Sequence, residues 1–129
     1  MLTMRLPSIY NYGFDEYVST WESPDPDKMI TASNWIWSDQ DSIKRWNRTA
    51  YYVDKTLEFL KKNRDKPCYI NLWPDDVHTP FVPNPQQLST DKNDWEKVES
   101  FRYVLKEYDK QIGRLMQGLK SLGVDNNTA

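Results

Sequence analysis

The chain has 129 residues, with 17 basic and 19 acidic side chains, one histidine and one cysteine. The formal net charge of −2 is too small for a disordered chain, and Leu, Ile, Val and Phe make about 21 % of the residues, just above the roughly 20 % below which disorder is expected. No concentrated basic stripe favours nucleic acid or an anionic membrane as a partner. One cysteine excludes an internal disulfide, and no apolar run is long enough to span a bilayer.

The first part of the chain, residues 1–48, is rich in aromatic and turn-forming residues and lacks a sustained helical period. Apolar and polar residues alternate over Phe14–Trp21, a pattern typical of a strand. We therefore predict a loop and strand region over residues 1–48.

The second part begins with a helical pattern. Ala50, Val53, Leu57 and Leu60 recur at intervals of three and four, so they share one face of a helix that should end before Pro67. The segment Cys68–Trp73 is short, β-prone and bounded by prolines, which predicts a strand. Four further prolines predict a loop over Pro74–Asn93.

The strongest helical pattern covers Asp94–Leu122. Asn93 and Glu96 have the spacing of a capping box, and Gly123 stands where a left-handed C-terminal cap is expected. Close helix packing would explain Gly113 and Gly118. The apolar positions fall within an arc of about 120°: Phe101, Val104, Leu105, Tyr108, Ile112, Leu115, Met116, Leu119 and Leu122.

This order of elements predicts an α/β fold, with residues 49–129 forming a helix, strand, loop and helix. Two short strands cannot cover a helix with so wide an apolar stripe. We therefore expect residues 1–129 to be a single partial domain of a larger fold, one that self-associates through exposed sheet or helix faces.

His78 is the first candidate for chemistry. It lies in a loop that leaves the carboxyl end of the predicted strand Cys68–Trp73, the edge where open α/β sheets bind ligands. Histidine titrates near neutral pH, so it can protonate a leaving group or donate a hydrogen bond to an anion. The alternative is a loop histidine that is hydrogen-bonded to neighbouring carboxylates.

Other residues allow further interpretations. Asp75 and Asp76 carry oxygen ligands for a divalent metal, but adjacent side chains on an extended backbone point in opposite directions. Cys68 is either a nucleophile or, more simply, a structural cysteine in a strand. Several aromatic residues could stack on sugar rings or pack in the core: Trp35, Trp37, Trp46, Tyr51 and Tyr52. Two segments match the glycosylation sequon, Asn47-Arg48-Thr49 and Asn126-Asn127-Thr128.

An ordered set of motifs carries a resemblance to a known family. From about residue 12 onward, the chain resembles the middle portion of the sulfatase family, which belongs to the alkaline-phosphatase superfamily. The matching segments, in order, are Tyr12–Tyr17, the helix into Lys66-Pro67, Asn71–Pro74, His78–Phe81, Tyr108–Leu115, Leu122-Gly123 and Asn127-Thr128.

The resemblance implies a fragment of an alkaline-phosphatase-like mixed sheet flanked by helices, and hydrolysis of aryl or carbohydrate sulfate monoesters. His78 occupies the position of the family's histidine in the H-x-P loop, which contacts the sulfate and can protonate the departing alcohol oxygen. The implied partner is a sulfated small molecule or glycan. Family members that act on sulfated glycans are commonly exported, which suggests a periplasmic or secreted parent protein.

The chain also departs from the family pattern. The family makes its formylglycine nucleophile from a C/S-x-P-x-R motif, and Cys68 lacks both the proline and the arginine. The resemblance therefore places formylglycine and calcium in the full-length parent, with neither held by this segment. We expect the isolated chain to be inactive. Two alternatives stay open: a non-catalytic binding or interaction module, and a phosphodiesterase or phosphonate hydrolase of the same superfamily.

Overall fold

The structure is a computed structural model that describes residues 7–20, 23–30, 41–87 and 96–129. The chain divides into two compact units, Met1–Arg45 and Trp46–Ala129. The prediction of one partial domain over residues 1–129 stays a prediction.

In the first unit, a short 3-10 helix, η1 (Ile9–Tyr12), is followed by loops held by side-chain contacts. The rings of Tyr10 and Tyr17 meet edge to face with centroids 4.9 Å apart, and the Tyr17 hydroxyl donates to Asp25 Oδ2 at 3.2 Å. Ile30 is fully buried. Aromatic packing and turn hydrogen bonds therefore organise the described part of this unit.

The first predicted helix of the second unit is confirmed. Helix α1 (Arg48–Lys62) follows the 3-10 helix η2 (Arg45–Asn47) and buries Val53 completely. Asn63 ends it, because its side-chain amide donates to the carbonyl of Phe59 at 2.9 Å and so satisfies one of the last carbonyls of the helix. The helix thus stops before Pro67, as the sequence predicts.

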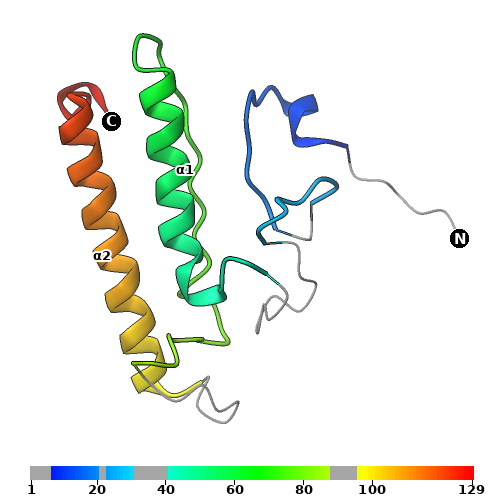
Figure 1. The fold of residues 1–129 in the computed structure, drawn as a ribbon, viewed down its shortest axis with the longest axis vertical. Helices are drawn as coiled ribbons and strands as arrows, with labels where there is room; N and C mark the ends of the chain where they lie inside the picture. The colour runs from blue at the N-terminus through cyan, green and yellow to red at the C-terminus, as the bar shows by residue number, and fades with distance from the viewer. Residues whose placement is uncertain (1–6, 21–22, 31–40, 88–95) are drawn as a thin grey trace, which may run out of the picture. The chain divides into compact units, whose positions relative to one another are not determined.

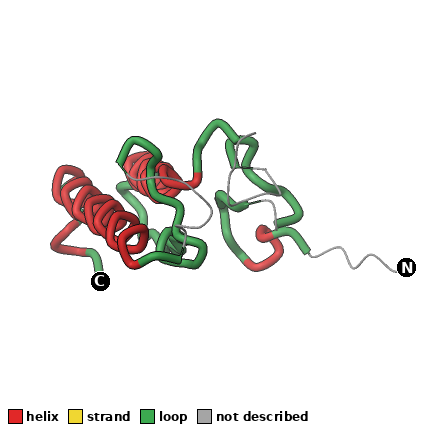
Figure 2. Tube along the Cα trace, turned by 90° about the horizontal axis from the view of Figure 1, so that it is seen from below, coloured by secondary structure: helices red, strands yellow, loops and turns green. Residues whose placement is uncertain are grey.

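The second predicted helix is also confirmed, over a shorter range. Helix α2 (Val98–Leu122) ends at Gly123, whose φ of 70° is the left-handed conformation predicted for this cap. Figures 1 and 2 show α1 and α2 side by side in the second unit. The absence of a side chain at Gly118 allows part of this close packing. A Cβ at this position would lie 2.5 Å from Leu57 Cδ2.

Three details of the α2 prediction, namely its first residue, its capping box and the role of Gly113, are wrong or untested. The helix begins four residues later than predicted, and its N-cap Lys97 makes no side-chain capping bond; Asn93 of the predicted capping box lies outside the described residues. A Cβ added at Gly113 would meet no heavy atom within 4 Å, so close packing does not account for this glycine. Leu105 and Met116 are 42 % and 58 % exposed, because α1 covers only part of the predicted apolar arc.

The predicted fold class, an α/β fragment of an alkaline-phosphatase-like mixed sheet, is wrong. The described residues form helices and loops, with no strand among them (Figure 2). Neither 14–20 nor Cys68–Trp73 is a strand, and Trp21 lies outside the described residues. A strand needs a neighbouring backbone to pair with, and Cys68–Trp73 makes no backbone hydrogen bond to another described residue.

The extended segment 67–75 instead runs back along α1. At its start, the Cys68 thiol contacts the carbonyl of Asn63, which caps the end of α1; at its end, Asp75 meets Arg48, the first residue of α1. In Figure 1 this segment lies beside α1 and leads to the loop that carries His78. None of the described helices is long and apolar enough to cross a membrane.

Candidate active site

The candidate site is built around His78, which lies exposed in the loop between segment 67–75 and helix α2. The backbone N–H of His78 donates to the carbonyl of Asp75 at 3.1 Å and closes a tight turn. The ring Nδ1 lies 2.6 Å from the carbonyl oxygen of Thr79. Because a carbonyl oxygen only accepts, this contact is a hydrogen bond in the tautomer that carries a proton on Nδ1.

An ion pair attaches this turn to helix α1. Arg48 Nη1 lies 3.4 Å from Asp75 Oδ2, and the side chain of Arg48 is fully buried while that of Asp75 is 31 % exposed. The carboxylate of Asp75 therefore binds the helix, and its carbonyl holds the backbone of His78. Arg48 is a positioning residue of the candidate site, and nothing in the sequence pattern linked it to a residue 27 positions away.

The alternative interpretations of neighbouring residues find little support in the geometry. Asp75 contacts Arg48, whereas Asp76 is buried elsewhere, 5 % exposed. Within the described ranges, no three His, Cys, Asp or Glu side chains gather in a group that could hold a metal ion. The Cys68 thiol is half-buried and contacts the carbonyls of Asn63 and Lys66. These residues therefore fit neither a calcium site nor a formylglycine precursor.

The aromatic candidates have separate environments. Tyr51 and Tyr52 are half-buried on α1, with ring centroids 6.4 Å apart, and Lys55 Nζ lies 5.5 Å from the Tyr51 ring. Trp46 is half-buried before α1 and lines a cleft beside α2. Trp35 and Trp37 lie outside the described residues.

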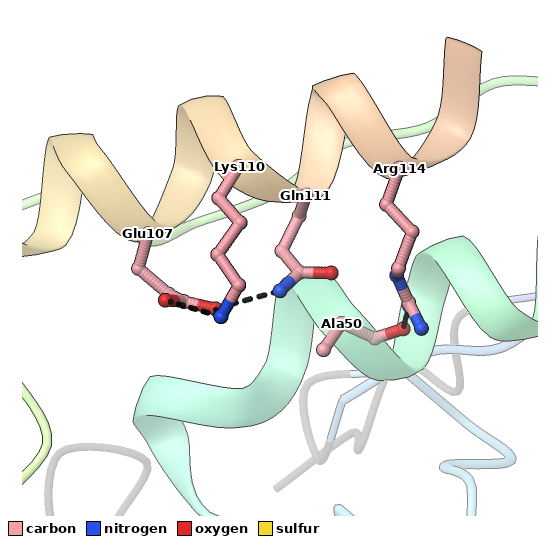
Figure 3. Close-up of polar contacts among 5 residues, drawn as sticks. All are labelled: Ala50, Glu107, Lys110, Gln111 and Arg114. Atoms are coloured by element: carbon pink, nitrogen blue, oxygen red, sulfur yellow. Dashed lines mark hydrogen bonds and ion pairs between the residues drawn. The ribbon is translucent and has the colours of Figure 1, made fainter. Parts of the chain in front are cut away.

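Polar contacts on one face of α2 hold this part of the structure (Figure 3). Lys110 Nζ donates to both carboxylate oxygens of Glu107 at 3.2 Å, and Gln111 Nε2 donates to Glu107 Oε1 at 2.6 Å. Arg114 crosses to α1, where it donates to the carbonyl of Ala50 at 2.7 Å and pairs with Asp54 at 2.8 Å. The first three contacts lie within α2, whereas those of Arg114 join α2 to the start of α1, which also carries Arg48.

The cleft has a volume of about 140 Å³ and lies between the loop that carries His78, the 3-10 helix η2 and helix α2. Sequence reasoning missed it, although Tyr103, Glu107 and Lys110 recur at intervals of three and four, the spacing of one helix face. This spacing does not by itself predict a cleft, because polar residues on one face of a helix usually indicate only a solvent-exposed face.

In the described part of the chain, His78 is thus exposed on a turn that is anchored to α1, and other residues of the same loop line a cleft. The sequence model of the sulfatase family matches residues 4–129. The chain therefore belongs to the sulfatase family, a family of hydrolases, as the motifs from residue 12 onward predicted. Comparison with curated proteins finds no match, and neither does comparison with solved structures.

Proposed function

We propose that this chain is the substrate-side segment of a sulfatase-like hydrolase that cleaves sulfate monoesters, either aryl or carbohydrate sulfates. His78 is the proton donor to the departing alcohol oxygen. The observation that carries the proposal is the bond between Nδ1 of His78 and the carbonyl of Thr79, which holds the ring and makes Nε2 the nitrogen that exchanges a proton.

The chemistry follows from this arrangement. The sulfuryl group passes to a nucleophile that the parent hydrolase would supply. As the new bond to sulfur forms and the bond between sulfur and the alcohol oxygen breaks, Nε2 of the protonated ring gives its proton to that oxygen, and the alcohol leaves neutral. The ring keeps the proton on Nδ1, where Thr79 accepts its hydrogen bond. Asp75 and Arg48 keep the turn in place through the ion pair at 3.4 Å, so the ring returns to the same position after each proton transfer.

Within the described residues, no group of three or more His, Cys, Asp or Glu side chains could hold a metal ion, and Cys68 lacks the proline and the arginine of the formylglycine motif. The proposal therefore assigns calcium and formylglycine to the parent hydrolase, and the proton transfer from His78 is the one step assigned to this chain. A sulfated small molecule or glycan is the proposed partner. The isolated chain is expected to turn over no sulfate ester.

The test compares two esters in the full product of the open reading frame that contains this chain. His78→Ala should lower kcat for an alkyl or sugar sulfate by about 10²- to 10⁴-fold, because the alkoxide is a poor leaving group without a proton. The loss for 4-nitrophenyl sulfate should be much smaller, because nitrophenolate leaves unprotonated. Asp65→Asn, at an exposed position away from the loop, is the matched control.

Equal losses on the two esters, or no loss, would contradict the role of His78. Turnover of phosphate diesters or phosphonate esters in place of sulfate esters would favour the other hydrolases of the superfamily. Turnover of an aryl sulfate by the isolated chain, abolished by His78→Ala, would contradict the expectation that it is inactive alone.

A further inference from the structure

We propose that helix α2 pairs antiparallel with the α2 helix of a second copy of this chain, through a stripe of the helix that α1 leaves exposed. At about 100° per residue, Val98, Leu105, Ile112 and Met116 fall within about 40° of one another on the helix. Val98, Leu105 and Met116 are 64 %, 42 % and 58 % exposed, and Ile112 is half-buried. We call these four residues the outer stripe of α2.

The outer stripe is distinct from the face of α2 that packs on α1. Gly118 lies against Leu57 of α1, and it is about 140° round the helix from Leu105. The buried residues Val104 and Gln111 lie on the same side as Gly118. Figure 1 accordingly shows α1 on one side of α2. The outer stripe is therefore an apolar face that another helix can cover.

The charges beside the outer stripe indicate a second copy as the partner and set its direction. Arg102 and Asp109 are both exposed and lie within about 60° of Leu105. In an antiparallel pair with its two-fold axis midway between positions 105 and 106, Arg102 of each copy lies level with Asp109 of the other. The symmetry gives two such ion pairs. A parallel pair in register would instead bring like charges together, which is unfavourable.

Arg102 has the hydrogen-bonding capacity for this contact. Its Nη1 lies 2.8 Å from Oε1 of Glu99, one turn away in the same helix. A guanidinium carries five N–H donors. Donors therefore remain for the carboxylate of Asp109 in the second copy.

The same register matches the apolar residues. Leu105 of the two copies meets at the two-fold axis, and Val98 lies level with Gly113 of the second copy, next to Ile112. A Cβ at Gly113 would meet no heavy atom within 4 Å, so packing on α1 does not require this glycine. Its small size leaves room for Val98 of the second copy.

The length of the contact predicts a weak dimer. The paired part runs from position 98 to position 113 and is about 24 Å long at 1.5 Å per residue. One pair of helices of this length should bury less than about 1,200 Å², which is typical of weak and reversible interfaces. The dimer should therefore form and dissociate readily with concentration.

Charge-reversal variants of the 129-residue chain test the ion pairs, with the dissociation constant of the dimer measured by sedimentation equilibrium. Arg102→Asp should raise this constant about tenfold, because both pairs change from attraction to repulsion, and so should Asp109→Arg. The double variant should return it to within about threefold of the native value, because the pairs re-form with their charges exchanged. Arg64→Asp, at an exposed position after α1, makes the same change in net charge and should have little effect.

Three results of this experiment would overturn the proposal. The first is a native chain that stays monomeric, and the second is a double variant that associates no better than the single variants. The third is association that none of the variants alters, which would place the contact elsewhere, such as on the extended segment 67–75. The circular dichroism of each variant checks that the helices are intact.

A paramagnetic label tests the direction of the pair. Chain that carries Val98→Cys and Cys68→Ser, with a nitroxide at position 98, is mixed with ¹⁵N-labelled native chain. An antiparallel pair should broaden the amide signals of Ile112 and Gly113 in the native copy. Broadening centred on Val98 would show a parallel pair, and no broadening would show that the two helices do not meet; either result would contradict the proposal.

Discussion

At the scale of single residues, the candidate site depends on the ion pair that holds the turn at His78 against helix α1. Arg48 is fully buried, and its guanidinium lies 3.4 Å from the carboxylate of Asp75, whose carbonyl accepts the backbone N–H of His78. A buried charge is costly without its partner. The ion pair therefore stabilises the fold and the position of His78 together.

We expect Asp75→Asn to lower the free energy of unfolding of the helical unit by about 3 kcal/mol. This is the lower end of the roughly 3–5 kcal/mol for breaking a buried pair, because Asp75 is partly exposed while Arg48 is not. Urea unfolding followed by the circular dichroism of the helices measures it. Asp65→Asn, at an exposed position, should change stability by less than about 0.5 kcal/mol; similar values for the two variants would show that the pair contributes little.

The two glycines of α2 give a matched pair of substitutions. Gly118→Ala would bring its Cβ to 2.5 Å from Cδ2 and 2.6 Å from Cδ1 of Leu57, so that Leu57 or the helix must move. Because these Cδ atoms are the far end of a flexible side chain, we expect Leu57 to shift and to offset the gain in helix propensity, so that the net change is within about 0.5 kcal/mol. Gly113→Ala meets nothing within 4 Å and should raise stability by about 0.5–1 kcal/mol through helix propensity. Thermal melts of both variants test this, and a Gly118→Ala variant that is as stabilised as Gly113→Ala would contradict the observed packing.

Tyr17 gives the first unit a dependence on high pH. Desolvation raises the pKa of its hydroxyl above 10.0, and the nearby Asp25 carboxylate raises it further. Since the folded pKa exceeds the unfolded value, the contribution of Tyr17 to stability is present below pH 10 and is lost as the pH rises through the folded pKa.

The tyrosinate absorbance of the native chain should therefore contain one ionisation above pH 10 that is absent from Tyr17→Phe. Tyr12→Phe is the control, because its side chain is 67 % exposed. If the ionisation step that Tyr17→Phe loses relative to the native chain lay near pH 10, the ordinary value for tyrosine, the raised pKa of Tyr17 would be contradicted.

At the scale of elements, the two helices are joined by polar contacts as well as apolar ones. Arg114 donates to the carbonyl of Ala50 and pairs with Asp54, both on α1. Arg102, on the same helix, pairs with Glu99 only one turn away. The contacts of Arg114 therefore link two helices, whereas the ion pair of Arg102 links neighbours within one helix.

We expect Arg114→Ala to lower the free energy of unfolding by about 1 kcal/mol, the upper end for partly exposed pairs, because an additional bond to a carbonyl is lost. Arg102→Ala should cost only about 0.3–0.5 kcal/mol. Chemical unfolding at low and high salt measures both. Equal costs would mean that Arg114 does not join the helices in solution.

The elements also show where sequence patterns succeed. Helix α1 follows from the spacing of Val53, Leu57 and Leu60, and helix α2 from that of Phe101, Val104 and Tyr108. These intervals of three and four residues are enough to predict a helix, because a helix satisfies its backbone hydrogen bonds within itself. Cys68–Trp73 has the composition of a strand but no partner among the described residues. A strand pattern alone cannot supply the neighbouring backbone that a sheet needs.

At the scale of the whole molecule, exposed apolar surface is the main feature. In the described part of the chain, Trp73 and Tyr69 of the extended segment are 83 % and 76 % exposed, and Val98 and Met116 on α2 are 64 % and 58 % exposed. Large exposed apolar side chains favour association. We propose that the chain self-associates through the extended segment and the uncovered face of α2.

Sedimentation equilibrium should show a mass that rises with concentration, and the double substitution Tyr69→Ser with Trp73→Ser should shift that rise to higher concentration. Tyr12→Ser, in the first unit, removes a side chain of similar exposure and should have little effect. A monomer at all concentrations with a sharp thermal transition would instead favour a stand-alone binding module.

The sequence by itself determined the two long helices, the left-handed end of α2 at Gly123 and membership of the sulfatase family. Each of these depends on local spacing or on an ordered set of motifs. Only the tertiary structure decided that Asp75 binds Arg48, that Gly118 contacts Leu57, and that the His78 loop and α2 enclose a cleft. These contacts join residues far apart in the chain, and no local pattern specifies which distant side chains will meet when the helices pack.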